Sequence, residues 1–154
     1  LYKDPVPAIL SVAGTGSLYK PLLEYIAKNG LEKRIKLVGH LSNITKIMLD
    51  SHFIIIPTIY EENCPVTSLE AQAHYLPCIY TNSGGLPETQ INHKTGIMVS
   101  KNRPLEIVDA IKYLQSDLDR FNKMCLDARE NSLNFTMDKM AKNYSDLYLG
   151  LFEK

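Results

Sequence analysis

The sequence lacks an excess of charge of either sign. Its 154 residues include 17 Lys and Arg against 17 Asp and Glu, so the formal net charge at pH 7 is zero. A protein that attracts nucleic acid or anionic lipid through its overall field carries a surplus of positive charge. We therefore expect no nucleic-acid partner.

Cysteine and histidine are scarce. The three cysteines, Cys64, Cys78 and Cys125, are widely spaced and odd in number, which favours reduced thiols over a disulfide framework. The 4 histidines lack the spacing of metal ligands, so we expect no metal site. The sequence also shows no signal peptide and no apolar run long enough to cross a bilayer. These features predict a cytoplasmic protein with no transmembrane segment.

Apolar segments alternate with amphipathic ones over most of the chain. The apolar and β-branched runs predict parallel strands, at residues 8–13, 35–38, 53–57, 78–81 and 96–99. The segments between them predict helices, at residues 18–29, 44–50 and 66–74. This alternation predicts an α/β fold, a Rossmann-like parallel sheet with helices on both faces. Because 45% of the residues are apolar and 22% charged, we expect one soluble domain over residues 1–154.

Only helices are expected after residue 99, at residues 104–114, 117–132 and 136–152. The C-terminal helix 136–152 carries an apolar stripe, made of Met137, Met140, Tyr144, Leu147, Tyr148 and Leu151. We expect this stripe mainly to pack against the core.

A polar loop joins the strand at 53–57 to the next helix. Pro65 has the fixed φ that suits a helix start, and the helix would point its unpaired N–H groups into the cleft at the strand's carboxyl end. Glu62, in the loop, could accept hydrogen bonds from sugar hydroxyls, and Glu70, inside the helix, could hold two ribose hydroxyls. Thr67 could bond a phosphate oxygen. The segment therefore predicts a nucleotide-sugar site; the alternative for Glu70 is a solvated surface residue near a helix N-terminus.

A glycine pair follows the next predicted strand. Gly84 and Gly85 would let the main chain approach a ligand closely, and the alternative interpretation is a tight turn. Glu88, after Pro87, is expected to open a short helix that faces the same cleft.

These motifs together resemble a known family. Residues 62–71, 76–77, 84–88 and 96–99 resemble the C-terminal, donor-binding half of GT-B glycosyltransferases, and more narrowly the retaining family GT4, which is marked by two Glu separated by seven residues. Residues 8–16, AILSVAGTG, are similar to that family's strand ending in a Gly-x-Gly turn, and the similarity extends over nearly the whole chain.

The resemblance implies a role for each matching position. Glu62 would be the catalytic residue, contacting hydroxyls of the transferred sugar, and Glu70 would hold the ribose. The other donor-binding positions would lie around the sugar, diphosphate and base: Asn63, Cys64, Val66, Thr67, Gly14, Gly16, Gly39, His40, Leu41, Gly84 and Gly85.

Three positions depart from the family pattern. Asn63 and Cys64 stand where the family usually has Gly-Phe, and Tyr75 stands where Gly is common. Asn63 tolerates the left-handed backbone that a glycine would adopt, so we expect the loop to keep its shape.

The resemblance also implies partners. The chain would be a fragment that lacks its first strand region, with the diphosphate-binding Arg and Lys, and the N-terminal acceptor domain of the same protein. The donor would be a nucleotide diphosphate sugar, with no cofactor, and the acceptor a glycan or a lipid-linked glycan, which would allow a peripheral membrane location at full length. The fragment alone would be inactive. The resemblance also implies that the last helix crosses back onto the N-terminal domain, so part of the apolar stripe of 136–152 would be exposed in the fragment.

We therefore expect the chain to be part of a glycosyltransferase (a hexosyltransferase) that transfers a sugar with retention of anomeric configuration. Two alternatives stay open. One is a nucleotide-sugar 2-epimerase-like isomerase domain, since such enzymes share the GT-B architecture. The other is a Rossmann-like binding domain without chemistry.

Overall fold

The computed structural model of the chain describes residues 8–152. Strands and helices alternate as predicted up to residue 99, and only helices follow, so the α/β class is confirmed. The chain divides into two compact units, with the boundary between Lys46 and Ile47. The prediction of a single domain over residues 1–154 stays a prediction.

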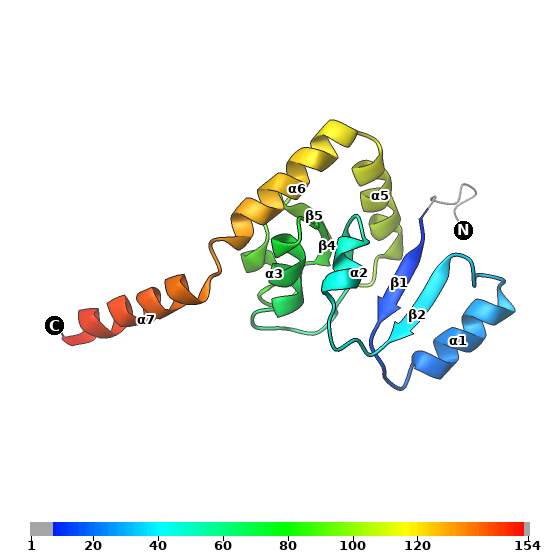
Figure 1. Cartoon of the computed structure of the whole chain (residues 1–154), viewed down its shortest axis with the longest axis horizontal. Coiled ribbons are helices and arrows are strands. Elements are labelled where there is room, and N and C mark those ends of the chain that lie inside the picture. The colour runs from blue at the N-terminus through cyan, green and yellow to red at the C-terminus, as the bar shows by residue number, and fades with distance from the viewer. Residues whose placement is uncertain (1–7, 153–154) are drawn as a thin grey trace. The chain divides into compact units, whose positions relative to one another are not determined.

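The first unit is built on a β-α-β motif (Figure 1). Strand β1 (Leu10–Ala13) pairs in parallel with β2 (Ile35–Gly39), and helix α1 (Tyr19–Lys28) connects them. The main-chain N–H of Gly14 donates to the carbonyl of Gly39 at 2.7 Å, so the carboxyl ends of the two strands are tied together.

The second unit contains a three-stranded parallel sheet in the order β3-β4-β5. Its strands are β3 (Ile54–Ile56), β4 (Cys78–Thr81) and β5 (Gly96–Val99). The predicted strands therefore form two hydrogen-bonded sheets, because β1 and β2 pair within the first unit and the other three within the second. Helix α2 (Thr45–Leu49) spans the boundary between the units.

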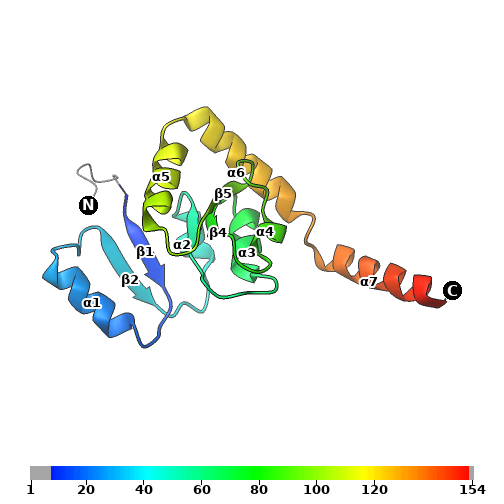
Figure 2. The same ribbon diagram turned by 180° about the vertical axis from the view of Figure 1, so that it is seen from behind.

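Helices cover both faces of this second sheet (Figures 1 and 2). On one face, Ile79 and Ile97 are buried against helix α5 (Pro104–Gln115) and helix α6 (Leu118–Ser132). Side chains alternate along a strand, so Cys78 points to the other face. There it lies by Ser68 of helix α3 (Val66–Ala73), and burial raises its pKa to about 12. The short helix α4 (Leu86–Thr89) also packs on β4.

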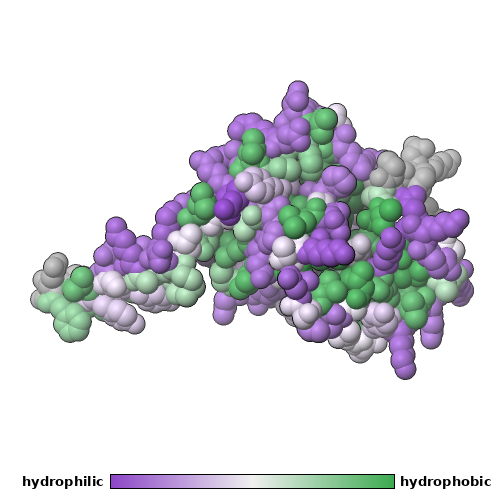
Figure 3. Space-filling view, in the orientation of Figure 1, coloured by the Kyte–Doolittle hydropathy of each residue, from purple (hydrophilic) through white to green (hydrophobic). Residues whose placement is uncertain are grey.

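The C-terminal helix α7 (Met137–Phe152) corrects one expectation. Its bounds match the prediction, but every one of its described residues is exposed, including Tyr144 and Leu147. Figure 2 shows α7 leading away from α6, and Figure 3 shows apolar side chains along one side of it. The expectation that the apolar stripe packs against the core is therefore wrong, because amphipathic spacing identifies an apolar face without identifying what covers it.

Within residues 8–152, no helix is long and apolar enough to span a bilayer.

Candidate functional site

Helix α3 begins at the carboxyl end of β3, as predicted. Pro65 is the residue immediately before the helix, with φ −71°, and Val66 is the first helical residue. The helix has two kinds of side chain. Ser68 and Gln72, one turn apart, are fully buried, whereas Thr67 is exposed and Glu70 is half-buried on the same helix face, since residues three apart are neighbours. Thr67 and Glu70 therefore stand on the part of α3 that a ligand could reach.

The loop before α3 presents the other predicted side chains to solvent. Glu62, Asn63 and Cys64 are all exposed. Asn63 is not among the described residues with positive φ, so this loop does not use the left-handed backbone that Asn63 would tolerate. Tyr75, which also replaces a family glycine, does adopt it, with φ 62°. This residue follows the C-cap of α3, a position that favours left-handed backbone.

The glycine pair allows this loop to dock on the next one. A Cβ at Gly84 would lie 2.3 Å from the carbonyl oxygen of Glu62, and a Cβ at Gly85 only 1.7 Å from that of Asn63. The main-chain N–H of Gly85 donates to the Glu62 carbonyl at 2.6 Å. The close approach that these glycines permit is thus first of all between two loops. Their contact with a ligand stays a prediction.

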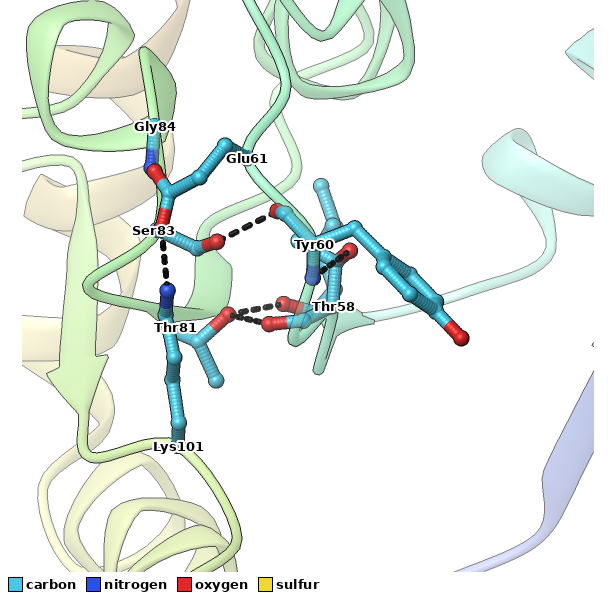
Figure 4. A network of polar contacts seen from close by, with 8 residues as sticks. Thr58, Tyr60, Glu61, Thr81, Ser83, Gly84 and Lys101 are labelled. Atoms are coloured by element: carbon cyan, nitrogen blue, oxygen red, sulfur yellow. Dashed lines mark hydrogen bonds and ion pairs between the residues drawn. The ribbon is translucent and has the colours of Figure 1, made fainter.

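Side-chain hydroxyls strengthen the same docking (Figure 4). Ser83 donates from Oγ to the carbonyl of Tyr60 at 2.5 Å, and Thr81 donates from Oγ1 to the carbonyl of Thr58 at 2.6 Å. Both donors are buried and lie at the end of β4 or just beyond it. The loop that carries Glu62 is therefore held along its length by the segment that follows β4.

A carboxylate completes the arrangement. Glu61 accepts the Gly84 N–H through Oε2 at 2.6 Å and the Lys101 ammonium through Oε1 at 2.6 Å. The hydrogen bond from Lys101, and then that from Gly84, lower the pKa of Glu61 from its ordinary value. Sequence analysis missed both Glu61 and Lys101. The Glu61-Glu62 doublet was the one available signal, and Lys101 lies 40 residues further along the chain.

A buried polar network supports α3 from behind. The Ser68 hydroxyl pairs with that of Thr89 at 2.8 Å and accepts from Gln90 Nε2 at 2.6 Å. Gln72 donates from Nε2 to the Thr89 carbonyl at 2.9 Å and accepts from Asn131 Nδ2 at 2.7 Å. Helix α3 is thereby fixed to α4 and to α6. Glu88, predicted to open a short helix, lies within α4 and is exposed.

The predicted site residues of the first unit gather at one end of its sheet. Gly14 and Gly16 line a hollow of about 220 Å³, together with Val12, Ala13, Thr15, Leu18, Tyr19, Leu22 and Leu37. Gly39 ends β2, and His40 and Leu41 follow directly. The structure therefore brings these five positions together at the carboxyl ends of β1 and β2. The other eight lie in the second unit, and donor binding by either group stays a prediction.

No group of three or more His, Cys, Asp or Glu side chains is placed to hold a metal ion among residues 8–152.

Comparison with known proteins identifies relatives of nearly the whole chain. Residues 2–134 match the family profile described as "Glycosyl transferases group 1". An Escherichia coli protein named UDP-Gal:alpha-D-GlcNAc-diphosphoundecaprenol alpha-1,3-galactosyltransferase is 27% identical over 147 residues, which are 94% of this chain and 37% of the relative. The N-acetyl-alpha-D-glucosaminyl L-malate synthase of Bacillus anthracis is 26% identical over 144 residues, 93% of this chain and 38% of the relative.

Solved structures share the fold. A glycosyltransferase from Rickettsia africae superposes with a TM-score of 0.83 at 28% identity, over 96% of this chain and 41% of that one. Anabaena HepE, solved in complex with UDP, gives 0.85 at 18% identity, over 95% and 42% of the two chains. This chain thus spans well under half the length of each of these proteins.

Proposed function

Because the chain belongs to the group 1 glycosyl transferases, we propose that it is the donor-binding part of an enzyme that transfers a sugar from a nucleotide diphosphate sugar. The full-length protein would carry an acceptor-binding domain N-terminal to this chain. The acceptor would be a glycan or a lipid-linked glycan, the anomeric configuration would be retained, and no cofactor would be needed. The full-length protein would be cytoplasmic, or peripheral at the membrane when the acceptor is lipid-linked.

The observation that supports this proposal best is the placement of Glu62 and Glu70. Both lie at the carboxyl end of β3, one in a docked loop and the other on the reachable face of α3. Ligands of open α/β sheets bind at that end of the strands. Glu70 would accept hydrogen bonds from two ribose hydroxyls, and Glu62 from hydroxyls of the transferred sugar. A hydrogen bond to a charged group contributes about 1.5–3 kcal/mol.

The start of α3 would serve the diphosphate. As the sugar leaves, negative charge develops on the diphosphate, and fixed N–H donors stabilise it without reorganising. The first main-chain N–H groups of α3 and the Thr67 hydroxyl are the donors that this chain would supply. Closure of the N-terminal acceptor domain and this donor-binding domain around the donor would exclude the water that otherwise hydrolyses it.

Donor binding tests the proposal directly. We expect calorimetry on this chain to detect weak binding of a uridine or guanosine diphosphate sugar, with no turnover. Glu70→Ala should lower the affinity by about ten-fold or more, since a charge-assisted bond of this size is lost. HepE is known in complex with UDP-glucose, which makes that donor the first to try.

The matched control is Glu130→Ala, which removes another glutamate carboxylate from an exposed position on α6. It should bind the donor as the unchanged chain does. Equal affinities for Glu70→Ala and Glu130→Ala would remove Glu70 from the ribose role. Incubation of the full-length protein with donor alone, followed by analysis for an epimerised sugar, separates a transferase from an isomerase.

A further inference from the structure

The Glu61 carboxylate links the three loops that follow the strands of the second sheet. Glu61 lies in the loop after β3, Gly84 in the loop after β4, and Lys101 in the loop after β5. Each carboxylate oxygen has its own donor, the Gly84 N–H at one and the Lys101 ammonium at the other, both at 2.6 Å. Glu61, Gly84 and Lys101, here called the Glu61 clamp, thus tie the carboxyl ends of all three strands of the second sheet.

The Glu61 clamp contributes little to holding the fold together. The Glu61 side chain is 72% exposed and that of Lys101 is 32% exposed. Ion pairs in such positions stabilise proteins weakly, because water competes for both charges and two long side chains must be ordered. We therefore expect the clamp to affect the local geometry of the loops more than the stability of the fold.

That geometry concerns the main chain of Glu62. On one side, the Glu62 main chain is packed against Gly84, where no Cβ would fit, and its carbonyl accepts from Gly85. On the other side, the carboxylate of the preceding residue, Glu61, accepts hydrogen bonds from Gly84 and Lys101. Two consecutive residues therefore anchor the same turn of the loop, one by its main chain and one by its carboxylate.

We propose that Glu61 and Lys101 are positioning residues that hold Glu62 at the angle required for sugar transfer. This inference rests on the proposed function, because it gives Glu62 the role of contacting the transferred sugar. Misplacement of a reacting group by about 1 Å can cost about 100-fold in rate. Loss of one of several anchors should cost less, and we expect a fall of about ten-fold in kcat.

The test uses the full-length protein and measures the release of nucleotide from the donor. UDP-glucose is tried first, followed by a panel of uridine and guanosine diphosphate sugars, and the donor that the protein consumes is used for all variants. Glu61→Gln and Lys101→Met each break the ion pair with little change in side-chain size. Both should lower kcat by about ten-fold while the donor KM and the Tm change little, and the double variant should be no slower than either single one, since both remove one contact.

Two further variants distinguish positioning from general structure. Lys123→Met removes another lysine ion pair, with Asp127 at 3.1 Å within α6, and should leave kcat unchanged. In a Glu62→Gln background, Glu61→Gln should no longer slow the reaction, because the group it positions is gone. Three results would overturn the inference. They are a Glu61→Gln effect in the Glu62→Gln background as large as the one in the unaltered protein, a kcat that neither clamp substitution changes, and a loss of rate accompanied by a fall in Tm larger than the slight one expected for an exposed ion pair. If the full-length protein consumes no donor of the panel, the proposed function itself is overturned and the inference with it.

Discussion

Two polar networks hold the segment from Glu61 to Gln72, and they differ in burial and in charge. The inner network is neutral and mostly buried. It consists of the buried residues Ser68, Gln72, Thr89, Gln90 and Thr95 and the half-buried Asn131. The outer one is the charged, largely exposed Glu61 clamp. A buried group that loses its partner pays the full cost of desolvation, whereas an exposed charge returns to water. The difference teaches that the inner network sets the stability of α3, while the clamp sets the orientation of a loop.

Loss of Gln72 should give the largest effect on stability. Gln72 is fully buried, and its amide joins the Thr89 carbonyl to the Asn131 side chain. Gln72→Ala would leave a cavity and remove the partner of Asn131 Nδ2, which keeps its contact with the Thr89 carbonyl at 3.1 Å. We expect the free energy of unfolding to fall by about 3 kcal/mol, measured by urea denaturation. If Gln72→Ala lowered the free energy of unfolding no more than Glu61→Gln does, the two networks would not differ in their contribution to stability.

A methyl group at Gly85 should have the next largest effect. The Cβ of Gly85→Ala would lie 1.7 Å from the Asn63 carbonyl oxygen, so the two loops must separate and the bond from Gly85 N–H to Glu62 would be lost. We expect a loss of about 2 kcal/mol in the free energy of unfolding and, in the full-length protein, of most of the transfer activity. This variant sharpens the comparison of the two networks. It separates the loop that carries Glu62 from the loop after β4, and it replaces no residue of the inner network.

The control for Gly85→Ala is Gly150→Ala. No atom lies within 4 Å of a Cβ built at Gly150, which stands inside α7. Alanine favours helix over glycine by about 1 kcal/mol, so this variant should be neutral or slightly more stable. Equal losses in the two glycine variants would show that the close approach of the loops is not what Gly85 provides.

The sequence predicted which elements carry Glu62 and Glu70, but not the polar contacts that hold those elements in place. The apolar run before Pro57 and the proline before α3 placed Glu62 and Glu70 correctly on a loop and a helix, because strand and helix starts are governed by neighbouring residues. The inner network depends on pairs far apart in the chain, such as Gln72 and Asn131, which are separated by 59 residues. Because polar residues are mostly exposed in proteins, the sequence alone predicts surface positions for such residues.

The same limit explains Glu61 and α7. Sequence alone could not show that the Glu61 carboxylate meets Gly84 and Lys101, because both partners lie far along the chain. It predicted the extent of α7 from spacing, but whether an apolar face is covered depends on tertiary contacts that spacing does not contain.

The pH dependence of stability should give the smallest effect and the sharpest test of the clamp. The pKa of Glu61 is lower in the folded protein than its ordinary value, chiefly because the carboxylate accepts from Lys101. A lowered carboxyl pKa stabilises the folded state above the ordinary glutamate pKa, about 4.3, and this contribution is lost as the pH falls through the lowered value. The unaltered chain should therefore have a slightly higher Tm than Glu61→Gln at neutral pH. In acid, where the carboxyl is protonated, the difference should vanish, and at neutral pH high salt should reduce it. A Tm difference that persists in acid would mean that Glu61 stabilises the fold by some means other than its charge, and the outer network would then resemble the inner one.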